Sequence, residues 1–214
     1  FRSQSIEMFE NYAKNIDGIV YQVDKTHIDY NKEYVNTRYV KYGELPTYMG
    51  YLRLGNIVGS LGKMPDSILD VGYGDGSFLK VCQNIVQRCY GSDISTYPVP
   101  EGCIQVTDLT ESFYDVITFF DSLEHFEDID FVKDLKCNYT CISVPYCHYK
   151  DDEWFRNWKH RRPNEHLWHF DQTSLTNFMI RMGYELVSGS NIEDTIRKNK
   201  ENEFNILTCV FKKV

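Results

Sequence analysis

The run Ile68–Gly76 (ILDVGYGDG) constrains the fold more than any other segment of the chain. A short apolar stretch leads directly into glycines at 72, 74 and 76, which allow a sharp turn and a close approach of backbone to ligand. Phe78, Val81, Cys82 and Ile85 then follow on one helical face. A strand, a glycine-rich turn and a helix are therefore expected, with a ligand near the free N–H groups of the helix start.

The rest of the chain continues an alternation of strands and helices. Helices are expected at Ser122–Leu135 and from the N-cap Asp171 to Gly183. The expected strands are Ser67–Val71, Cys89–Asp93, Cys103–Val106, Tyr114–Phe119, Tyr139–Val144, Tyr184–Ser188 and Asn205–Phe211. Such alternation predicts an α/β fold with a mostly parallel sheet covered on both faces. Residues 190–203 are too short for a packed crossover, so the last two strands should form an antiparallel pair.

A chain of 214 residues suits one domain with a real core. Residues 1–65 carry no clear strand signal, and tyrosines at helix-like intervals (Tyr30 and Tyr34, Tyr48 and Tyr51) predict a cap of N-terminal helices. We expect a ligand-binding core at 66–145, a substrate or lid insertion at 146–170, and a C-terminal helix with a strand pair at 171–214.

The composition limits the partners. A net charge of −8 argues against a protein that binds duplex nucleic acid, which normally presents a basic face. The seven cysteines include no Cys-x-x-Cys pair, which favours buried thiols in a reducing compartment. No apolar run approaches the length of a membrane span and no signal peptide is visible, so we expect a cytoplasmic protein.

The glycine spacing separates two nucleotide-binding families. A dinucleotide fingerprint needs Gly-x-Gly-x-x-Gly, whereas here the third glycine comes one position early, at Gly76. Gly-x-Gly-x-Gly after an acidic strand end resembles motif I of class I S-adenosylmethionine (SAM) dependent methyltransferases. The resemblance implies that Asp70 helps to hold the amino group of the methionine moiety. It also implies that the turn borders the cofactor through Gly72, Tyr73, Gly74 and Gly76.

Two later segments extend this resemblance. Asp93 ends the second strand, where a carboxylate can accept both ribose hydroxyls; the resemblance makes it the ribose ligand and Ile94 an adenine contact. The alternative for Asp93 is a turn-initiating residue. The resemblance also implies that Asp108 binds the adenine amino group, with the backbone of Leu109 nearby. Asp108 could equally be a solvated loop residue.

The stretch Tyr114–His125 (YDVITFFDSLEH) is similar to the fourth-strand motif of ubiquinone-biosynthesis O-methyltransferases and many small-molecule methyltransferases, and it adds Asp121 to the expected cofactor site. The resemblance covers roughly residues 45–214. It implies a Rossmann-like three-layer sandwich of about seven strands with an antiparallel last strand. The implied reaction moves a methyl group from SAM to an O or N atom of a small polar molecule, which leaves S-adenosylhomocysteine.

Methyl transfer is an in-line displacement that depends on alignment and a dry site, and a base helps when the acceptor is a hydroxyl. His125, just past the fourth strand, is the first candidate base, followed by His166 and His169. Each could instead be a structural histidine. Asp121, Glu124 and His125 also have the spacing of a divalent-metal cluster seen in some ubiquinone O-methyltransferases and small-RNA 2′-O-methyltransferases, completed there by a later histidine. Because aspartate replaces the usual glutamate, we assign no metal ligands, and a divalent metal is the less favoured alternative.

The insertion offers a candidate acceptor site. Arg156, Lys159, Arg161 and Arg162 form a basic patch that suits an anionic small-molecule acceptor, although a solvated charged loop explains it equally well. Three alternative functions remain: a SAM-binding protein that does not methylate, an NAD-dependent oxidoreductase, and a metal-dependent RNA 2′-O-methyltransferase. The sequence does not define the oligomeric state.

Overall fold

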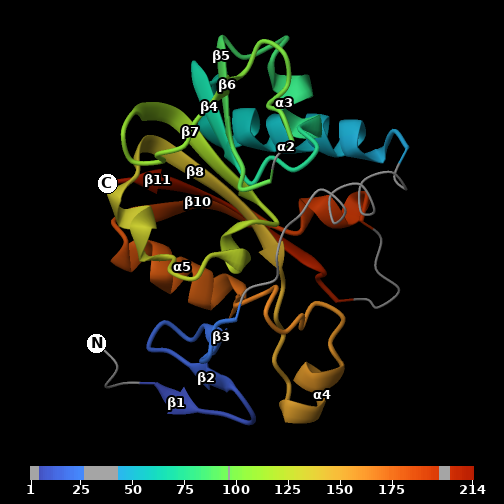
Figure 1. Cartoon of the computed structure of the whole chain (residues 1–214), viewed down its shortest axis with the longest axis vertical. Coiled ribbons are helices and arrows are strands. Elements are labelled where there is room, and N and C mark those ends of the chain that lie inside the picture. The colour runs from blue at the N-terminus through green and yellow to red at the C-terminus, as the bar shows by residue number, and fades with distance from the viewer. Residues whose placement is uncertain (1–4, 27–42, 96, 198–202) are drawn as a thin grey trace.

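A computed structural model describes residues 5–26, 43–95, 97–197 and 203–214. Its centre is a seven-stranded sheet in the order β10-β11-β8-β7-β4-β5-β6 (Figure 1). Five neighbouring strands are parallel, and β11 is antiparallel to both β8 and β10, as the sequence predicts. The strands are β4 (Ser67–Val71), β5 (Arg88–Ser92), β6 (Ile104–Gln105), β7 (Phe113–Phe120), β8 (Lys136–Pro145), β10 (Tyr184–Ser190) and β11 (Ile206–Lys213).

Helices cover both faces of this sheet, which confirms the predicted three-layer sandwich. On one face, α2 (Leu45–Leu61) and α3 (Ser77–Cys82) pack on Ile68 and Val116. On the other face, α5 (Gln172–Arg181) packs on Leu69 and Ile117. Adjacent strand residues thus enter opposite cores, because successive side chains of a strand point to opposite faces. The central strands are buried on both sides, which explains their continuous apolar sequence.

The N-terminal cap is only partly helical. Residues 5–26 form three short strands, β1 (Ile6–Glu7), β2 (Tyr12–Lys14) and β3 (Val20–Gln22), which make a second sheet with β9 (Trp168–His169). The helical prediction for this segment is wrong, because strands of two or three residues show no readable alternation and β3 pairs with a strand far along the chain. The Tyr30–Tyr34 interval lies outside the described residues. The Tyr48–Tyr51 interval does lie on a helix, α2.

Two further segments refine the sequence predictions. The expected helix at Ser122–Leu135 is two 3₁₀ turns, η1 (Leu123–His125) and η2 (Asp130–Asp134). The insertion holds α4 (Asp152–Asn157), capped by Asp151, and then β9. Figure 1 shows α4 beside the small sheet, at the end of the molecule to which β8 points. The predicted N-cap of α5 is confirmed, since Asp171 and Ser174 form a capping box.

Candidate functional site

The turn after β4 needs glycine at two positions for steric reasons. Gly72 and Gly76 have φ of +79° and +74°, in the left-handed region that favours glycine. A Cβ on Gly72 would lie 2.6 Å from the Cβ of Ser122, and one on Gly76 would lie 2.5 Å from a ring carbon of Pro100. The turn therefore packs against the chain that follows β7 and against the segment beyond β5.

Asp93 connects this turn to the end of β5. Its Oδ2 accepts a hydrogen bond of 2.8 Å from the backbone N–H of Gly74, and its Oδ1 accepts one of 2.6 Å from Ser95. The N–H of Gly72 donates to the carbonyl of Ser92 at 2.7 Å. Asp93 therefore initiates a turn and also fixes the glycine turn of the neighbouring strand. Ile94, the next residue, is 79% exposed.

Asp70 lies at the same edge of the sheet but inside the protein. Its carboxyl is 3% exposed and accepts a hydrogen bond of 2.7 Å from the hydroxyl of Thr118 on β7. Burial raises the pKa of Asp70 to about 6, although the Thr118 hydrogen bond opposes the rise. A buried carboxylate in this environment gains stability from a nearby cation, such as an ammonium group.

The other expected cofactor residues differ in how deeply they are buried and in what they contact. The ring of Tyr73 is buried in the core, close to Gly91, and its hydroxyl donates to the carbonyl of Tyr97 at 2.5 Å. Leu109 is half-buried against the opposite core. Asp108 is exposed and accepts two hydrogen bonds from Thr110 in its own turn, which lower the pKa of Asp108. The side chain of Tyr73 thus has a packing role within the turn.

Asp121, directly after β7, belongs to a charge network. It adopts a left-handed backbone with φ of +53°, and its carboxylate accepts hydrogen bonds of 2.9 and 3.0 Å from Arg197 and one of 3.5 Å from Arg53. Both arginines also bind Glu193, which is fully buried. Burial alone would raise the pKa of Asp121, but Arg197 and Arg53 lower it to about 2.

His125 lies one turn further along, in a second cluster. Its Nε2 is 3.9 Å from the carboxylate of Glu124, and its ring meets the ring of His166 edge to face with centroids 4.8 Å apart. Of the family-implied metal set, Glu124 and His125 approach one another and are joined by His166. Asp121 is instead bound by Arg53 and Arg197. Glu124, His125 and His166 provide donor groups that suit a metal ion. The set of Asp121, Glu124 and His125 does not fit one, because the two arginines bind Asp121.

The remaining expectations for the insertion are partly corrected. His169 is packed between Tyr12 and Phe155, and burial lowers its pKa to about 3, which favours the structural alternative over a catalytic base. The three arginines of the predicted basic patch each have a carboxylate partner. Arg156 and Arg161 both bind Glu10 of the N-terminal segment, and Arg162 binds Glu165. The two pairs with Glu10 attach the insertion to the N-terminal segment that carries the small sheet.

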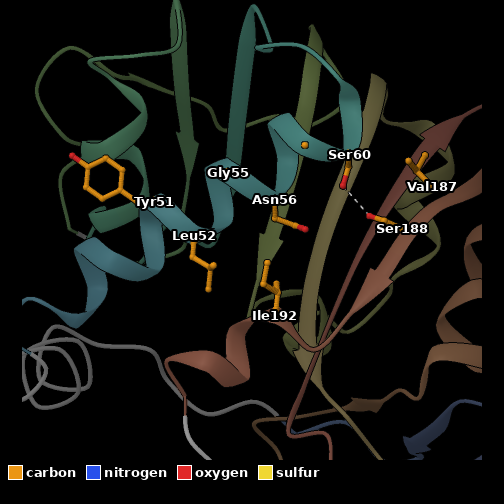
Figure 2. A pocket seen from close by; sticks show the side chains of 9 residues that line it. Tyr51, Leu52, Gly55, Asn56, Ser60, Val187, Ser188 and Ile192 are labelled. Atoms are coloured by element: carbon orange, nitrogen blue, oxygen red, sulfur yellow. Dashed lines mark hydrogen bonds between the residues drawn. The ribbon is translucent and has the colours of Figure 1, made fainter.

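An open groove of about 680 Å³ lies elsewhere, between α2, β10 and η3 (Ile192–Thr195). Figure 2 shows Ser60 and Ser188 joined by a hydrogen bond within its lining, with their hydroxyl oxygens 2.9 Å apart. Its lining residues are Tyr51, Leu52, Gly55, Asn56, Gly59, Ser60, Val187, Ser188 and Ile192. None of them belongs to the glycine turn or to the His125 cluster, so the groove is separate from the candidate site.

Sequence reasoning missed the partners of Asp121. Arg53 lies on α2 and Glu193 on η3, so that their contact joins residues 140 positions apart. No motif or spacing signals this pairing. His166 was a candidate base, but its approach to Glu124 and His125 depends on the path of the insertion, which the sequence pattern does not specify.

Comparisons with known proteins agree with the fold. The methyltransferase domain family matches residues 49–189. No curated protein matches the chain. No helix among the described residues is long and apolar enough to cross a membrane.

Three solved structures illustrate the structural similarity. A Burkholderia thailandensis 1,6-didemethyltoxoflavin-N1-methyltransferase has 13% identity and a TM-score of 0.60, with 99% of this chain and 100% of that chain covered. A magnesium protoporphyrin IX methyltransferase from Synechocystis PCC 6803 has 15% identity and a TM-score of 0.55, with 82% and 89% covered. A complex of the Haloferax volcanii Trm112 methyltransferase activator with a putative methyltransferase has 13% identity and a TM-score of 0.56, with 80% and 94% covered. At these identities the similarity concerns the fold.

Proposed function

The chain belongs to the methyltransferase domain family, and from this premise we propose that it transfers the methyl group of SAM to an oxygen or nitrogen atom of a small polar molecule. In such a transfer a lone pair of the acceptor attacks the methyl carbon, and the bond from that carbon to sulfur breaks. The electron pair stays on sulfur, which yields S-adenosylhomocysteine. The acceptor then loses its proton. Family membership removes the NAD-dependent oxidoreductase from the alternatives.

The contact between Gly74 and Asp93 carries the cofactor side of this proposal. It brings a carboxylate that can accept ribose hydroxyls next to the glycine turn, at the carboxyl ends of β4 and β5 where ligands bind in such sheets. Asp70, buried at the end of the adjacent strand, would gain from the cationic amino group of the methionine moiety. In this proposal Ile94, Asp108 and Leu109 border the adenine, and Asp121 completes the cofactor site through its arginine network.

The similar structures and the charge of the chain support a small-molecule acceptor. Two of the similar structures are named as methyltransferases of 1,6-didemethyltoxoflavin and of magnesium protoporphyrin IX, which are small molecules. A net charge of −8 and the carboxylate partners of Arg156, Arg161 and Arg162 disfavour RNA as the acceptor. The same ion pairs also weaken the case for an anionic acceptor, since the three arginines already have carboxylate partners.

His125 is the proposed catalytic residue on the acceptor side. It is the last residue of η1, the short turn that follows the carboxyl end of β7. His125→Ala should lower the rate of methyl transfer about 100-fold while the affinity for SAM changes less than about threefold. An imidazole that accepts the proton and one that holds a metal ion near the acceptor oxygen predict the same loss. This variant therefore tests only whether His125 belongs to the site.

The proposal is tested by incubating the protein with methyl-labelled SAM and a panel of small hydroxyl and amine compounds. S-adenosylhomocysteine and a labelled small product are expected, and both should be lost in Asp93→Ala. SAM binding without turnover on the panel would favour a SAM-binding protein that does not methylate. Label transferred to RNA instead, with binding that weakens as salt rises, would favour the RNA alternative.

A further inference from the structure

Glu124 is buried with a carboxylate that lacks hydrogen-bond donors among the described residues. Its side chain is 1% exposed, yet neither carboxylate oxygen receives a hydrogen bond from another described residue. Leaving a buried polar group unpaired costs about 1–3 kcal/mol, and more for a charged group. A fold that keeps such a group usually has a partner for it.

Two histidines lie where that partner would bind. Glu124, His125 and His166 each offer one ligand atom, and these atoms lie within 4.8 Å of one another. Two donor atoms on one tetrahedral ion lie about 3.4 Å apart, so the three groups need to converge by roughly 1.4 Å. One carboxylate and two imidazoles form a three-ligand set that leaves further positions of an ion open to a substrate or water.

Two hydrogen bonds orient the residues of this cluster, one from the backbone of Leu167 and one from the ring of His166. The N–H of Leu167 donates to the carbonyl of Glu124 at 2.8 Å, which fixes the insertion against η1. His166 Nδ1 lies 2.8 Å from the carbonyl oxygen of His160, and a carbonyl can only accept, so Nδ1 carries the proton. The lone pair of His166 is therefore on Nε2. A second hydrogen bond that orients a ligating imidazole in this way is typical of metal sites.

Asp121 is kept out of the set. Arg197 and Arg53 both bind its carboxylate, and Arg197 donates to both of its oxygens. To reach a metal ion, Asp121 would have to give up charge-assisted hydrogen bonds in a half-buried network. The oxygen-rich ligand set that Mg²⁺ prefers is therefore absent from the cluster, in which nitrogen donors predominate.

We propose that Glu124, His125 and His166 bind a divalent transition-metal ion of the zinc type, and that Asp121 is not a ligand. This ion would neutralise the buried Glu124 carboxylate and satisfy its oxygens. The claim concerns metal binding and stands independently of the methyl transfer proposed above. Where both hold, the ion supplies Lewis acidity to an acceptor oxygen, and His125 acts as a ligand rather than as a proton acceptor.

The test uses untagged, full-length protein that has been treated with chelator and then titrated with Co²⁺ as a spectroscopic probe. Competition with Zn²⁺ and Mg²⁺ follows, and circular dichroism verifies that each variant is folded. One equivalent of Co²⁺ should bind, Zn²⁺ should displace it, and Mg²⁺ should compete at least 100-fold less well. Glu124→Gln, His125→Ala and His166→Ala should each weaken Co²⁺ binding at least tenfold. Asp121→Asn and the distant control His148→Ala should change it less than about threefold.

Several outcomes would overturn the proposal. Absence of Co²⁺ and Zn²⁺ binding at micromolar concentrations would do so, as would binding that persists in all three ligand variants. Equal loss in Asp121→Asn would replace the three-ligand set with one that includes Asp121. Competition by Mg²⁺ at comparable concentration would overturn the ion class. Titration with SAM in the same samples distinguishes these failures from a failure of the proposed function, because SAM binding depends on Asp93 and not on Glu124.

Discussion

The two sides of the candidate site are built in different ways. The cofactor side joins residues that are close in sequence, since Asp70, the glycines and Asp93 lie within the segment 70–93. The backbone N–H groups of Gly72 and Gly74 donate to Ser92 and Asp93 at the end of β5. The side that follows β7 is assembled from distant segments, where Asp121 meets Arg53 of α2 and Arg197 beyond η3. The first depends on backbone geometry and the second on the pairing of buried charges. Substitutions on the two sides should therefore lower stability or SAM affinity for different physical reasons.

The largest effect is expected from Arg53→Leu. Glu193 is fully buried, and Arg53 binds it at 2.8 Å, so the variant leaves a buried carboxylate with Arg197 alone. The free energy of unfolding, measured by urea titration, should fall by about 4 kcal/mol. In the control Lys212→Leu, which removes an exposed ion pair with Glu185, it should fall by less than about 1 kcal/mol. Equal losses would show that the buried network contributes no more than a surface pair.

Gly72→Ala tests the cofactor side through the backbone. The new Cβ would combine a left-handed conformation with a clash against Ser122, so the free energy of unfolding should fall by about 3 kcal/mol. Gly62→Ala has a similar φ of +69° but no atom near its Cβ, and it should cost about 1 kcal/mol. A matching loss in both variants would mean that the close approach of the turn to Ser122 has no energetic consequence.

Asp70→Asn should stabilise the protein, although most substitutions in a protein core destabilise it. Because burial raises the pKa of Asp70 to about 6 from 3.8, the unfolded chain releases this proton at lower pH than the folded protein. The carboxyl therefore lowers stability progressively from about pH 4 to about pH 6 and remains unfavourable above that range. Without SAM, the variant should be more stable than the parent by about 3 kcal/mol at pH 7.5 and equal to it at pH 3.5, by thermal or urea unfolding.

The same substitution should weaken SAM binding, since it removes the charge that would attract the ammonium group. For the unsubstituted protein, affinity for SAM should fall as the pH drops below about 6, because the Asp70 carboxyl becomes protonated. A variant that is less stable at pH 7.5 and binds SAM normally would contradict the assignment of Asp70.

The smallest effect is expected from Asp108→Ala, which removes the side-chain acceptor. The residue is exposed and its hydrogen bonds stay within its own turn, so one hydrogen bond to adenine should contribute about 1 kcal/mol, or roughly fivefold in SAM affinity. Calorimetric titration at fixed salt measures this change. No change at all would support the alternative of a solvated loop residue.

These contrasts also explain what the sequence could predict. Apolar strands and glycines at 72, 74 and 76 leave a local signature, so the sheet, its antiparallel end and the turn with Asp70 could be predicted. The strands at 5–26 could not, because β3 is completed by Trp168 and His169 from the insertion. The partners of Asp121 and the approach of His166 to Glu124 depend on side chains brought together by the complete fold. No sequence spacing predicts a buried ion pair between residues 140 positions apart, such as Arg53 and Glu193.

Calorimetric titration of the purified protein with SAM, S-adenosylhomocysteine and NADH tests the central claim most directly. The account predicts saturable binding of SAM and S-adenosylhomocysteine, absence of NADH binding, and at least 100-fold weaker SAM binding in Asp93→Ala. That variant must remain folded, which circular dichroism verifies. A folded, ligand-free sample that does not bind SAM, or an Asp93→Ala variant that binds it normally, would contradict the placement of the cofactor at the glycine turn.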